Sequence, residues 1–111
     1  MFGQPQVPAT DVSAVTDQTF LLDVREADEW QAGRAPNAVH APMSLIQQNL
    51  SAIPNDRQIV VVCRVGGRSE QVVAWLVSQD YDALNLAGGM MAWAAAGRPI
   101  VNDAGSDGFV L

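Results

Sequence analysis

The only cysteine of the chain opens a segment of seven residues that is rich in glycine and arginine. Its members are Cys63, Arg64, Val65, Gly66, Gly67, Arg68 and Ser69. Two adjacent glycines let a short loop curl so that successive backbone N–H groups point into one concavity. Guanidinium groups add permanent positive charge and donors that suit oxyanions. The segment therefore predicts an anion-binding loop with a sulfur atom at its base.

A thiol in such a loop ionises easily. The pKa of free cysteine is about 8.5, and helix N-termini and neighbouring arginines lower it. We therefore expect Cys63 to be a thiolate at neutral pH. Such a nucleophile could attack a sulfur donor, hold one sulfur atom as a persulfide and pass it to a thiophilic acceptor, with no separate general base. The alternative is an inert, buried cysteine, but an ordinary turn needs no pair of arginines around two glycines.

Apolar runs and helix signals alternate along the chain and place this loop. We expect strands at residues 19–24, 38–40, 59–62 and 83–86. We expect helices at residues 26–31 and 90–96, a helical face formed by Leu45, Ile46, Leu50 and Ile53, and a helix that is capped by Ser69 and ends near a left-handed Asp80. Residues 7–101 form the expected domain, and residues 1–6 and 102–111 the expected flexible tails.

The order of these elements predicts the fold and the position of the loop. Residues 59–62 are apolar at successive positions, which suits a strand covered on both faces, as in a parallel sheet. Strands that alternate with helices predict an α/β fold with a mostly parallel sheet. In such sheets ligands bind beyond the carboxyl ends of the strands, and the segment that begins at Cys63 follows a strand directly.

Length and composition exclude several classes of protein. The chain has 111 residues, of which 49% are apolar and 16% charged, and a net charge of −6 with no lysine. That charge disfavours nucleic acid and anionic membranes as partners. The apolar runs are too short for a membrane span, and no signal peptide is visible. One cysteine and one histidine leave no disulfide and no zinc site, so we predict no metal, no cofactor and a reducing cytoplasm.

Four segments, in order along the chain, resemble the rhodanese family of sulfurtransferases, in particular its small single-domain members. The cysteine loop is similar to the family's Cys-Arg-Ser-Gly-x-Arg-Ser, apart from Val65. Residues 22–26 resemble its Asp-Val-Arg segment and residues 33–42 its Gly-His-Ile-x-Gly-Ala-x-x-x-Pro segment. Residues 85–93 resemble its closing Gly-Gly-x-x-x-Trp signature. The resemblance covers roughly residues 8–101, and four motifs in order are far more specific than one.

The resemblance implies a rhodanese-like parallel sheet of about five strands, with helices on both faces. It implies a persulfide on Cys63, surrounded by the N–H groups of residues 64–69. Asp23 and Arg25 would lie at the neighbouring strand end and support the site. Thiosulfate and cyanide are the family's assay pair. We therefore expect a small, thiosulfate-like sulfur donor, and as acceptor either cyanide or a thiol, which includes the thiol of a partner protein.

Some positions depart from the family pattern. Arg34 and Ala35 stand where the family has His-Ile. Asn37 replaces a glycine, which left-handed backbone tolerates better in asparagine than in most residues. Val65 places a branched apolar group where a hydroxyl is common, and we expect it to influence substrate preference because the loop's side chains form the pocket wall.

Two other classes of function remain open at this point. Cysteine phosphatases and arsenate reductases have a similar loop but typically read Cys-x5-Arg, whereas four residues separate Cys63 from Arg68 and make a smaller ring. Rhodanese-like modules that only bind partners commonly lack the cysteine, which this chain retains. His40 is predicted to be an ordinary polar residue near a strand end, and Asp28 and Glu29 a solvated helix face.

Overall fold

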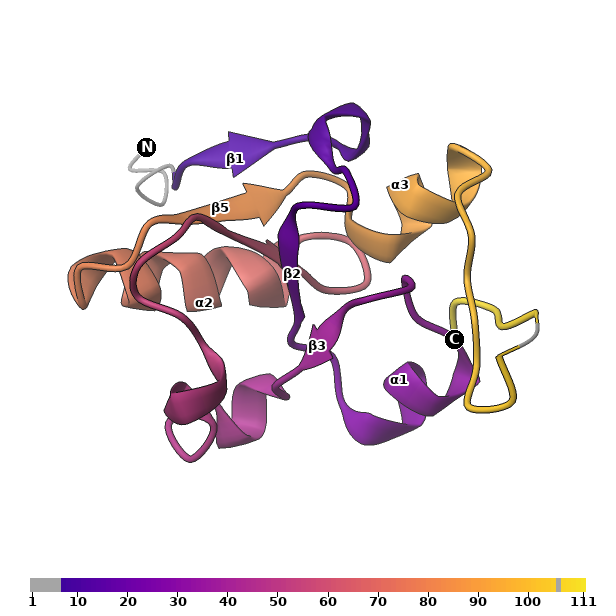
Figure 1. Cartoon of the computed structure of the whole chain (residues 1–111), viewed down its shortest axis with the longest axis horizontal. Coiled ribbons are helices and arrows are strands. Elements are labelled where there is room, and N and C mark those ends of the chain that lie inside the picture. Colours follow the sequence, from indigo (N-terminus) through magenta and orange to yellow (C-terminus); the bar gives the residue numbers. More distant parts are fainter. Residues whose placement is uncertain (1–6, 106) are drawn as a thin grey trace, which may run out of the picture.

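The computed structural model describes residues 7–105 and 107–111, so the tail predicted for residues 1–6 lies outside the described residues. Its centre is a five-stranded parallel sheet with the strand order β1-β5-β4-β2-β3 (Figure 1). The strands are β1 (Ala9–Thr10), β2 (Phe20–Asp23), β3 (Val39–His40), β4 (Ile59–Val62) and β5 (Ala83–Leu86). The predicted α/β fold with a parallel sheet is confirmed.

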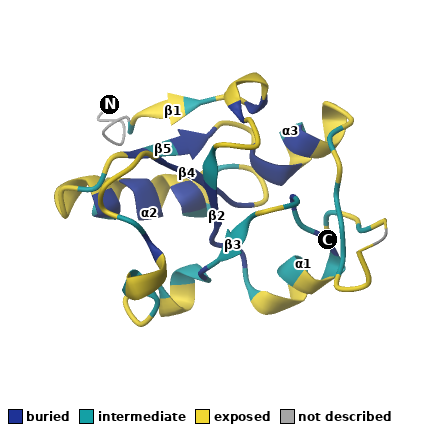
Figure 2. Cartoon of the chain, in the orientation of Figure 1, coloured by how far each residue is buried: buried dark blue, intermediate teal, exposed yellow. Residues whose placement is uncertain are grey.

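The middle strand of the sheet, β4, has no solvent-facing side. Ile59 and Val61 belong to the apolar cluster on one face of the sheet, and Val60 and Val62 to the cluster on the other. All four residues are at most 4% exposed, and the strand is dark throughout in Figure 2. Burial on both faces requires an apolar residue at every position, which explains the uninterrupted apolar run.

Helices cover both faces of the sheet. The α-helices are α1 (Ala27–Ala32), α2 (Gly67–Ser78) and α3 (Gly89–Ala95), and the 3-10 helices are η1 (Val12–Ala14), η2 (Met43–Leu45) and η3 (Leu50–Ala52). On one face α2 packs Val72, Val73 and Leu76 against the sheet, and on the other α3 packs Met90 and Trp93. In the described part of the chain, no helix combines the length and apolar character that crossing a membrane requires.

Two elements differ from the sequence-based prediction. The helical face expected from Leu45 to Ile53 forms two separate turns, η2 and η3. Asn49 lies between them, and its Nδ2 donates to the carbonyl of Leu45 at 2.9 Å, a bond that competes with a continuous helix. No sequence signal predicts β1, because two residues at a sheet edge are too few for a periodicity. By contrast, α2 is followed by Asp80 in the predicted left-handed conformation, with φ of 69°.

The chain after α1 accommodates its departures from the family pattern. The guanidinium of Arg34 lies 4.6 Å from the centroid of the Trp30 ring and forms an ion pair with Asp103 at 2.7 Å. Asn37 adopts left-handed backbone with φ of 68°, as predicted. The substitutions are therefore tolerated because the arginine gains a ring and a carboxylate, and the asparagine takes the backbone conformation of the glycine that it replaces.

The C-terminal segment packs against the end of α1. Arg34 and Val101 exchange two backbone hydrogen bonds, each 2.9 Å long. Further along, the backbone nitrogen of Phe109 donates to the carbonyl of Ala32 at 3.0 Å. The backbone of Gly108 passes so close to α1 that an added Cβ would lie 2.9 Å from that same carbonyl oxygen. These contacts connect the segment to α1 through the backbone, and the flexible tail at residues 102–111 stays a prediction.

Candidate active site

The cysteine loop joins the carboxyl end of β4 to the start of α2. Gly66 caps α2 in a left-handed conformation (φ of 119°) that favours glycine. Ser69, which the sequence predicts as the cap, instead lies in the first turn of the helix and is fully buried. That prediction is wrong because the glycine turns the chain before the serine is reached. As a result the serine hydroxyl faces the sulfur of Cys63.

Loop donors surround the sulfur atom. Cys63 is only 1% exposed and contacts the apolar cluster on the α2 face, but its Sγ accepts a hydrogen bond from Gly66 N at 3.1 Å and lies 3.2 Å from the Ser69 hydroxyl, a second group that can donate to it. Burial raises the pKa of this thiol. Hydrogen bonds from the Ser69 hydroxyl and from the backbone of Ser69, Gly66 and Val65 outweigh burial, so the net pKa is lowered. The direction agrees with the predicted thiolate, and the main cause is the loop's own donors.

The first turn of α3 holds the carbonyl groups of this loop. Met90 N donates to the carbonyl of Cys63 at 2.9 Å, and Met91 N donates to that of Arg64 at 3.0 Å. Gly89 packs directly behind the loop. A Cβ added there would lie 2.6 Å from the Arg64 carbonyl oxygen and closer still to that of Cys63, and its φ of +56° is unusual for other residues. Because the carbonyl groups of Cys63 and Arg64 point toward α3, the N–H groups of the loop can point toward the sulfur.

Asn85 joins the site from β5, although the sequence-based prediction does not include it. Its Oδ1 is 2.5 Å from Ser69 Oγ, and its Nδ2 donates to the carbonyl of Gly66 at 3.3 Å. The residue is only 7% exposed. An amide among the apolar residues of a buried strand needs hydrogen-bond partners, so its polarity is the one sequence signal that could have indicated this role.

The two arginines of the loop are engaged with other parts of the chain. Arg68 donates to both carboxylate oxygens of Glu29 in α1, at 2.6 and 2.8 Å. This hydrogen-bonded pairing lowers the pKa of Glu29 and raises that of Arg68. Arg64 Nε donates to the carbonyl of Leu111 at 3.1 Å. The predicted solvated face is correct for Asp28, which is exposed, and wrong for Glu29, because sequence spacing does not reveal that α1 meets the start of α2.

Asp23 and Arg25 lie at the end of β2, the strand beside β4. They form an ion pair whose two side chains have no exposed surface, with Nη2 and Oδ2 2.7 Å apart. The same Nη2 donates to the carbonyl of Gly33 at 2.8 Å. The backbone between these two residues is bonded to the end of β4, because Val24 N donates to the carbonyl of Val62 at 3.0 Å. The supporting role of the pair in the site stays a prediction.

His40 contacts the chain after β2 and the ring of Trp30 in α1. Its Nε2 lies 2.8 Å from the carbonyl oxygen of Arg25. Its ring stacks on that of Trp30, with the centroids 4.5 Å apart and the planes 6° from parallel. These contacts agree with the structural role predicted for the histidine.

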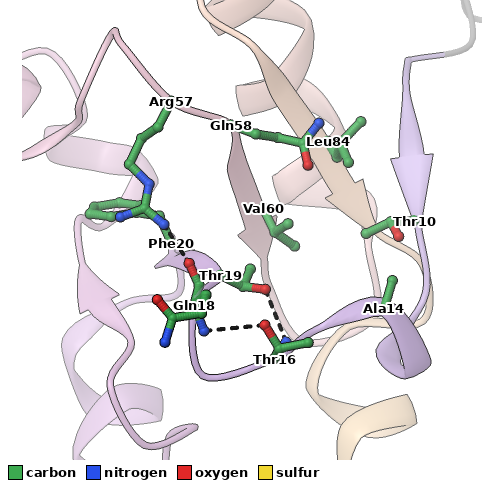
Figure 3. A pocket seen from close by; sticks show the side chains of 10 residues that line it. All are labelled: Thr10, Ala14, Thr16, Gln18, Thr19, Phe20, Arg57, Gln58, Val60 and Leu84. Atoms are coloured by element: carbon green, nitrogen blue, oxygen red, sulfur yellow. Dashed lines mark hydrogen bonds between the residues drawn. The ribbon is translucent and has the colours of Figure 1, made fainter.

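A groove of about 300 Å³ lies elsewhere, near the amino ends of β2 and β4. Gln18 and Thr19 line it before β2, Arg57 and Gln58 line it before β4, and Phe20 lies beneath Arg57 (Figure 3). None of its lining residues belongs to the cysteine loop. The groove is therefore not part of the candidate site.

Comparisons with known proteins agree with this fold. A model of the rhodanese-like domain matches residues 9–96. The chain is 46% identical over 89 residues to a sulfurtransferase of Allochromatium vinosum, covering 79% of this chain and 83% of the relative. It is 32% identical over 92 residues to the thiosulfate sulfurtransferase GlpE of Pseudomonas savastanoi pv. phaseolicola, covering 81% and 87%. A solved structure of a rhodanese-related protein from Thermoplasma volcanium matches with a TM-score of 0.79 at 25% identity, covering 85% and 97%.

The sheet topology defines an α/β fold, and the matched domain model and the sulfurtransferase relatives define the class of protein, an enzyme that transfers sulfur. The chain belongs to the rhodanese-like family. It is a rhodanese-type sulfurtransferase, and the family resemblance of the four sequence segments is confirmed.

Proposed function

We propose that the enzyme takes a sulfane sulfur from a thiosulfate-like donor onto Cys63 and passes it to a thiophilic acceptor. The Cys63 thiolate attacks the outer sulfur of thiosulfate. The sulfur–sulfur bond of the donor breaks, and sulfite leaves with its electron pair. Cyanide in vitro, or a thiolate in the cell, then attacks the terminal sulfur of the persulfide, and Cys63 leaves as a thiolate.

One observation carries this proposal: a buried sulfur whose pKa is lowered by hydrogen bonds. Backbone N–H groups that stabilise a thiolate also stabilise the anionic terminal sulfur of a persulfide. The name of the relative from Pseudomonas savastanoi supports thiosulfate as the donor. Since Cys63 is 1% exposed, the proposed reaction requires the atoms that cover the sulfur to move as the donor approaches. A single cysteine suits a reducing cytoplasm, which we propose as the compartment.

Intact mass spectrometry tests the proposal directly. After incubation with thiosulfate and removal of small molecules, the wild-type chain is expected to gain the mass of one sulfur atom. Cys63→Ala is expected to gain none, and cyanide is expected to return the loaded wild type to its original mass. An equal gain in Cys63→Ala would refute the role of this cysteine, and no gain in the wild type would refute thiosulfate as donor.

A further inference from the structure

The hydroxyl of Ser69 has more acceptors than it has protons. Its Oγ lies 2.5 Å from Asn85 Oδ1, 3.2 Å from Cys63 Sγ and 3.2 Å from the carbonyl oxygen of Gly66. A serine hydroxyl carries a single proton, so it donates one full hydrogen bond at a time. The three acceptors therefore compete for one hydrogen.

The orientation of the Asn85 amide decides which acceptor is favoured. The carbonyl oxygen of Gly66 only accepts, so the amide atom that faces it at 3.3 Å must be the donor, Nδ2. Oδ1 then faces Ser69, and since this oxygen also only accepts, the 2.5 Å contact requires the serine proton to point at Oδ1. Asn85 thus holds the proton that would otherwise point at the sulfur.

This arrangement suits the two protonation states of Cys63 differently. In the thiol, S–H donates to Ser69 Oγ while Ser69 donates to Asn85, and every group has a partner. When the thiol proton leaves to water, an oxygen lone pair would face the thiolate. The hydroxyl must then rotate toward Sγ and leave Asn85 Oδ1 without its donor. Ionisation therefore exchanges the hydrogen bond from Ser69 to Asn85 for a hydrogen bond from Ser69 to the sulfur.

We propose that Asn85 is a positioning residue that sets the ionisation of Cys63 by competing for the hydroxyl proton of Ser69. The inference deepens the proposed function and rests on it for the role of Cys63 as nucleophile. In the persulfide the negative charge sits on the terminal sulfur, so the serine proton is free to return to Asn85. The asparagine therefore disfavours the free thiolate relative to the loaded state. This shifts the loading equilibrium toward the persulfide and lowers the fraction of the resting enzyme that holds a thiolate.

Charged groups around the sulfur do not take over this role of Asn85. From α2, Arg68 interacts electrostatically with Cys63, but its guanidinium is paired with Glu29 of α1. From β2, Asp23 and Arg25 form a pair without net charge. Arg64 belongs to the loop itself and donates to the chain near its end. These charges are the same in every variant described below, so they cancel when the Cys63 pKa values are compared.

The test measures the pKa of Cys63 without any substrate. As the chain has one cysteine, both thiolate ultraviolet absorbance and the pH dependence of alkylation by iodoacetamide report this residue alone. Asn85→Leu removes the competing acceptor and is expected to lower the pKa by about 0.5 to 1 unit, the range that a single hydrogen bond spans. Asn85→Asp keeps the acceptor but adds a like charge, and is expected to raise the pKa by at least about one unit.

A double-mutant cycle separates this role from a general disturbance of the site. Ser69→Ala alone is expected to raise the Cys63 pKa, and adding Asn85→Leu to it is expected to cause no further shift. Leu84→Ala, one residue earlier on β5 with its side chain toward the groove of Figure 3, serves as the matched control and is expected to leave the pKa unchanged. Circular dichroism confirms that each variant is folded.

Two outcomes would overturn the inference. One is a folded Asn85→Leu or Asn85→Asp variant whose Cys63 pKa equals that of the wild type. The other is a shift on Asn85→Leu that persists at full size in the Ser69→Ala background. Neither outcome depends on sulfur transfer, so failure of the mass-spectrometric test would remove the proposed reaction while leaving the ionisation result to be judged by itself.

Discussion

The two ends of the sheet differ in shape and in chemistry, and the end with the open groove is not the end that holds the candidate site. The amino end carries an open groove of about 300 Å³, yet its one guanidinium, that of Arg57, already donates to the carbonyl of Gln18 at 2.5 Å (Figure 3). The carboxyl end holds Cys63, which is 1% exposed, among hydrogen-bond donors from the loop. The volume of a hollow is thus a poor guide to chemistry. The proposed nucleophile lies instead where backbone donors of the loop converge.

The direction of the strands explains this difference. In a parallel sheet every crossover enters its helix from the carboxyl end of a strand, so helix N-termini and their free N–H groups gather there. The loop before α2 and the first turn of α3 both lie at this end, and each contributes donors to the cysteine segment. The amino end receives helix C-termini and turns instead, which supply no comparable donors.

The largest expected effect is on the free energy of unfolding and comes from the buried ion pair at the carboxyl end of β2. Asp23→Asn leaves the guanidinium of Arg25 buried without its counter-charge, and removing one partner of such a pair costs about 3 to 5 kcal/mol. The matched control is Asp103→Asn, which breaks an ion pair whose carboxylate is 75% exposed and is expected to lose less than about 1 kcal/mol. Urea unfolding measures both, and equal losses would contradict a supporting role for the buried pair.

Gly89→Ala is expected to have the next largest effect. The new Cβ would collide with the carbonyl groups of Cys63 and Arg64 and would hold a left-handed backbone, at a combined cost above about 2 kcal/mol. Because the loop must move, sulfur loading should fall as well. Gly97→Ala shares the left-handed backbone (φ of +72°) but meets no atom within 4 Å, so it isolates backbone strain from the collision. Thermal melting and the rate of loading by thiosulfate distinguish the two variants, and identical behaviour would refute the close contact.

Smaller effects are expected from the ion pair between Glu29 and Arg68, through its pH dependence. Because the pairing lowers the pKa of Glu29 in the folded protein, its stabilisation is present above the ordinary pKa of the carboxyl and is lost as the pH falls through the folded-state value. Wild type should therefore exceed Glu29→Gln in stability by up to about 1 kcal/mol at neutral pH, and the gap should narrow on acidification. Chemical unfolding at several pH values measures the gap. A gap that widens in acid would contradict the assignment.

The smallest effect is expected at the amino end. Arg57→Ala removes an exposed guanidinium that lies 5.6 Å from the Phe20 ring, and should change stability by at most about 1 kcal/mol. Sulfur loading and the pKa of Cys63 should stay at their wild-type values. A clear loss of sulfur loading in this variant would remove the contrast between the two ends of the sheet.

Burial explains which parts of the fold could be predicted from the sequence. The predicted bounds of β4 and β5 equal the observed ones, because a buried strand shows itself as a short, mostly apolar run, which only Asn85 interrupts in β5. The two-residue strand β1 and the 3-10 turns around Asn49 depend on local hydrogen bonds that leave no periodic pattern. The order of the motifs was sufficient for the family. Three of them lie at the carboxyl end of a strand or directly after it, and the fourth, residues 33–42, runs from the end of α1 through β3.

The candidate site could be predicted only as far as it is continuous in sequence. The loop from Cys63 to Ser69 was identified because its residues are neighbours along the chain. Glu29 and Asn85 reach that loop from other elements, and such pairings follow from packing in three dimensions. Ser69 is predicted both as the helix cap and as a member of the loop that surrounds the sulfur. Its contact with the sulfur depends on where Gly66 starts the helix.

The hydrogen bonds from Met90 and Met91 to the loop carbonyls have a consequence for protein engineering. The orientation of the peptide groups around the thiol is imposed by residues that follow another strand, and Gly89 is the residue that permits the approach. Transplanting residues 63–69 into an unrelated α/β scaffold would therefore carry the nucleophile without the support that turns its peptide dipoles. A working graft would also need the first turn of α3, which begins with Gly89.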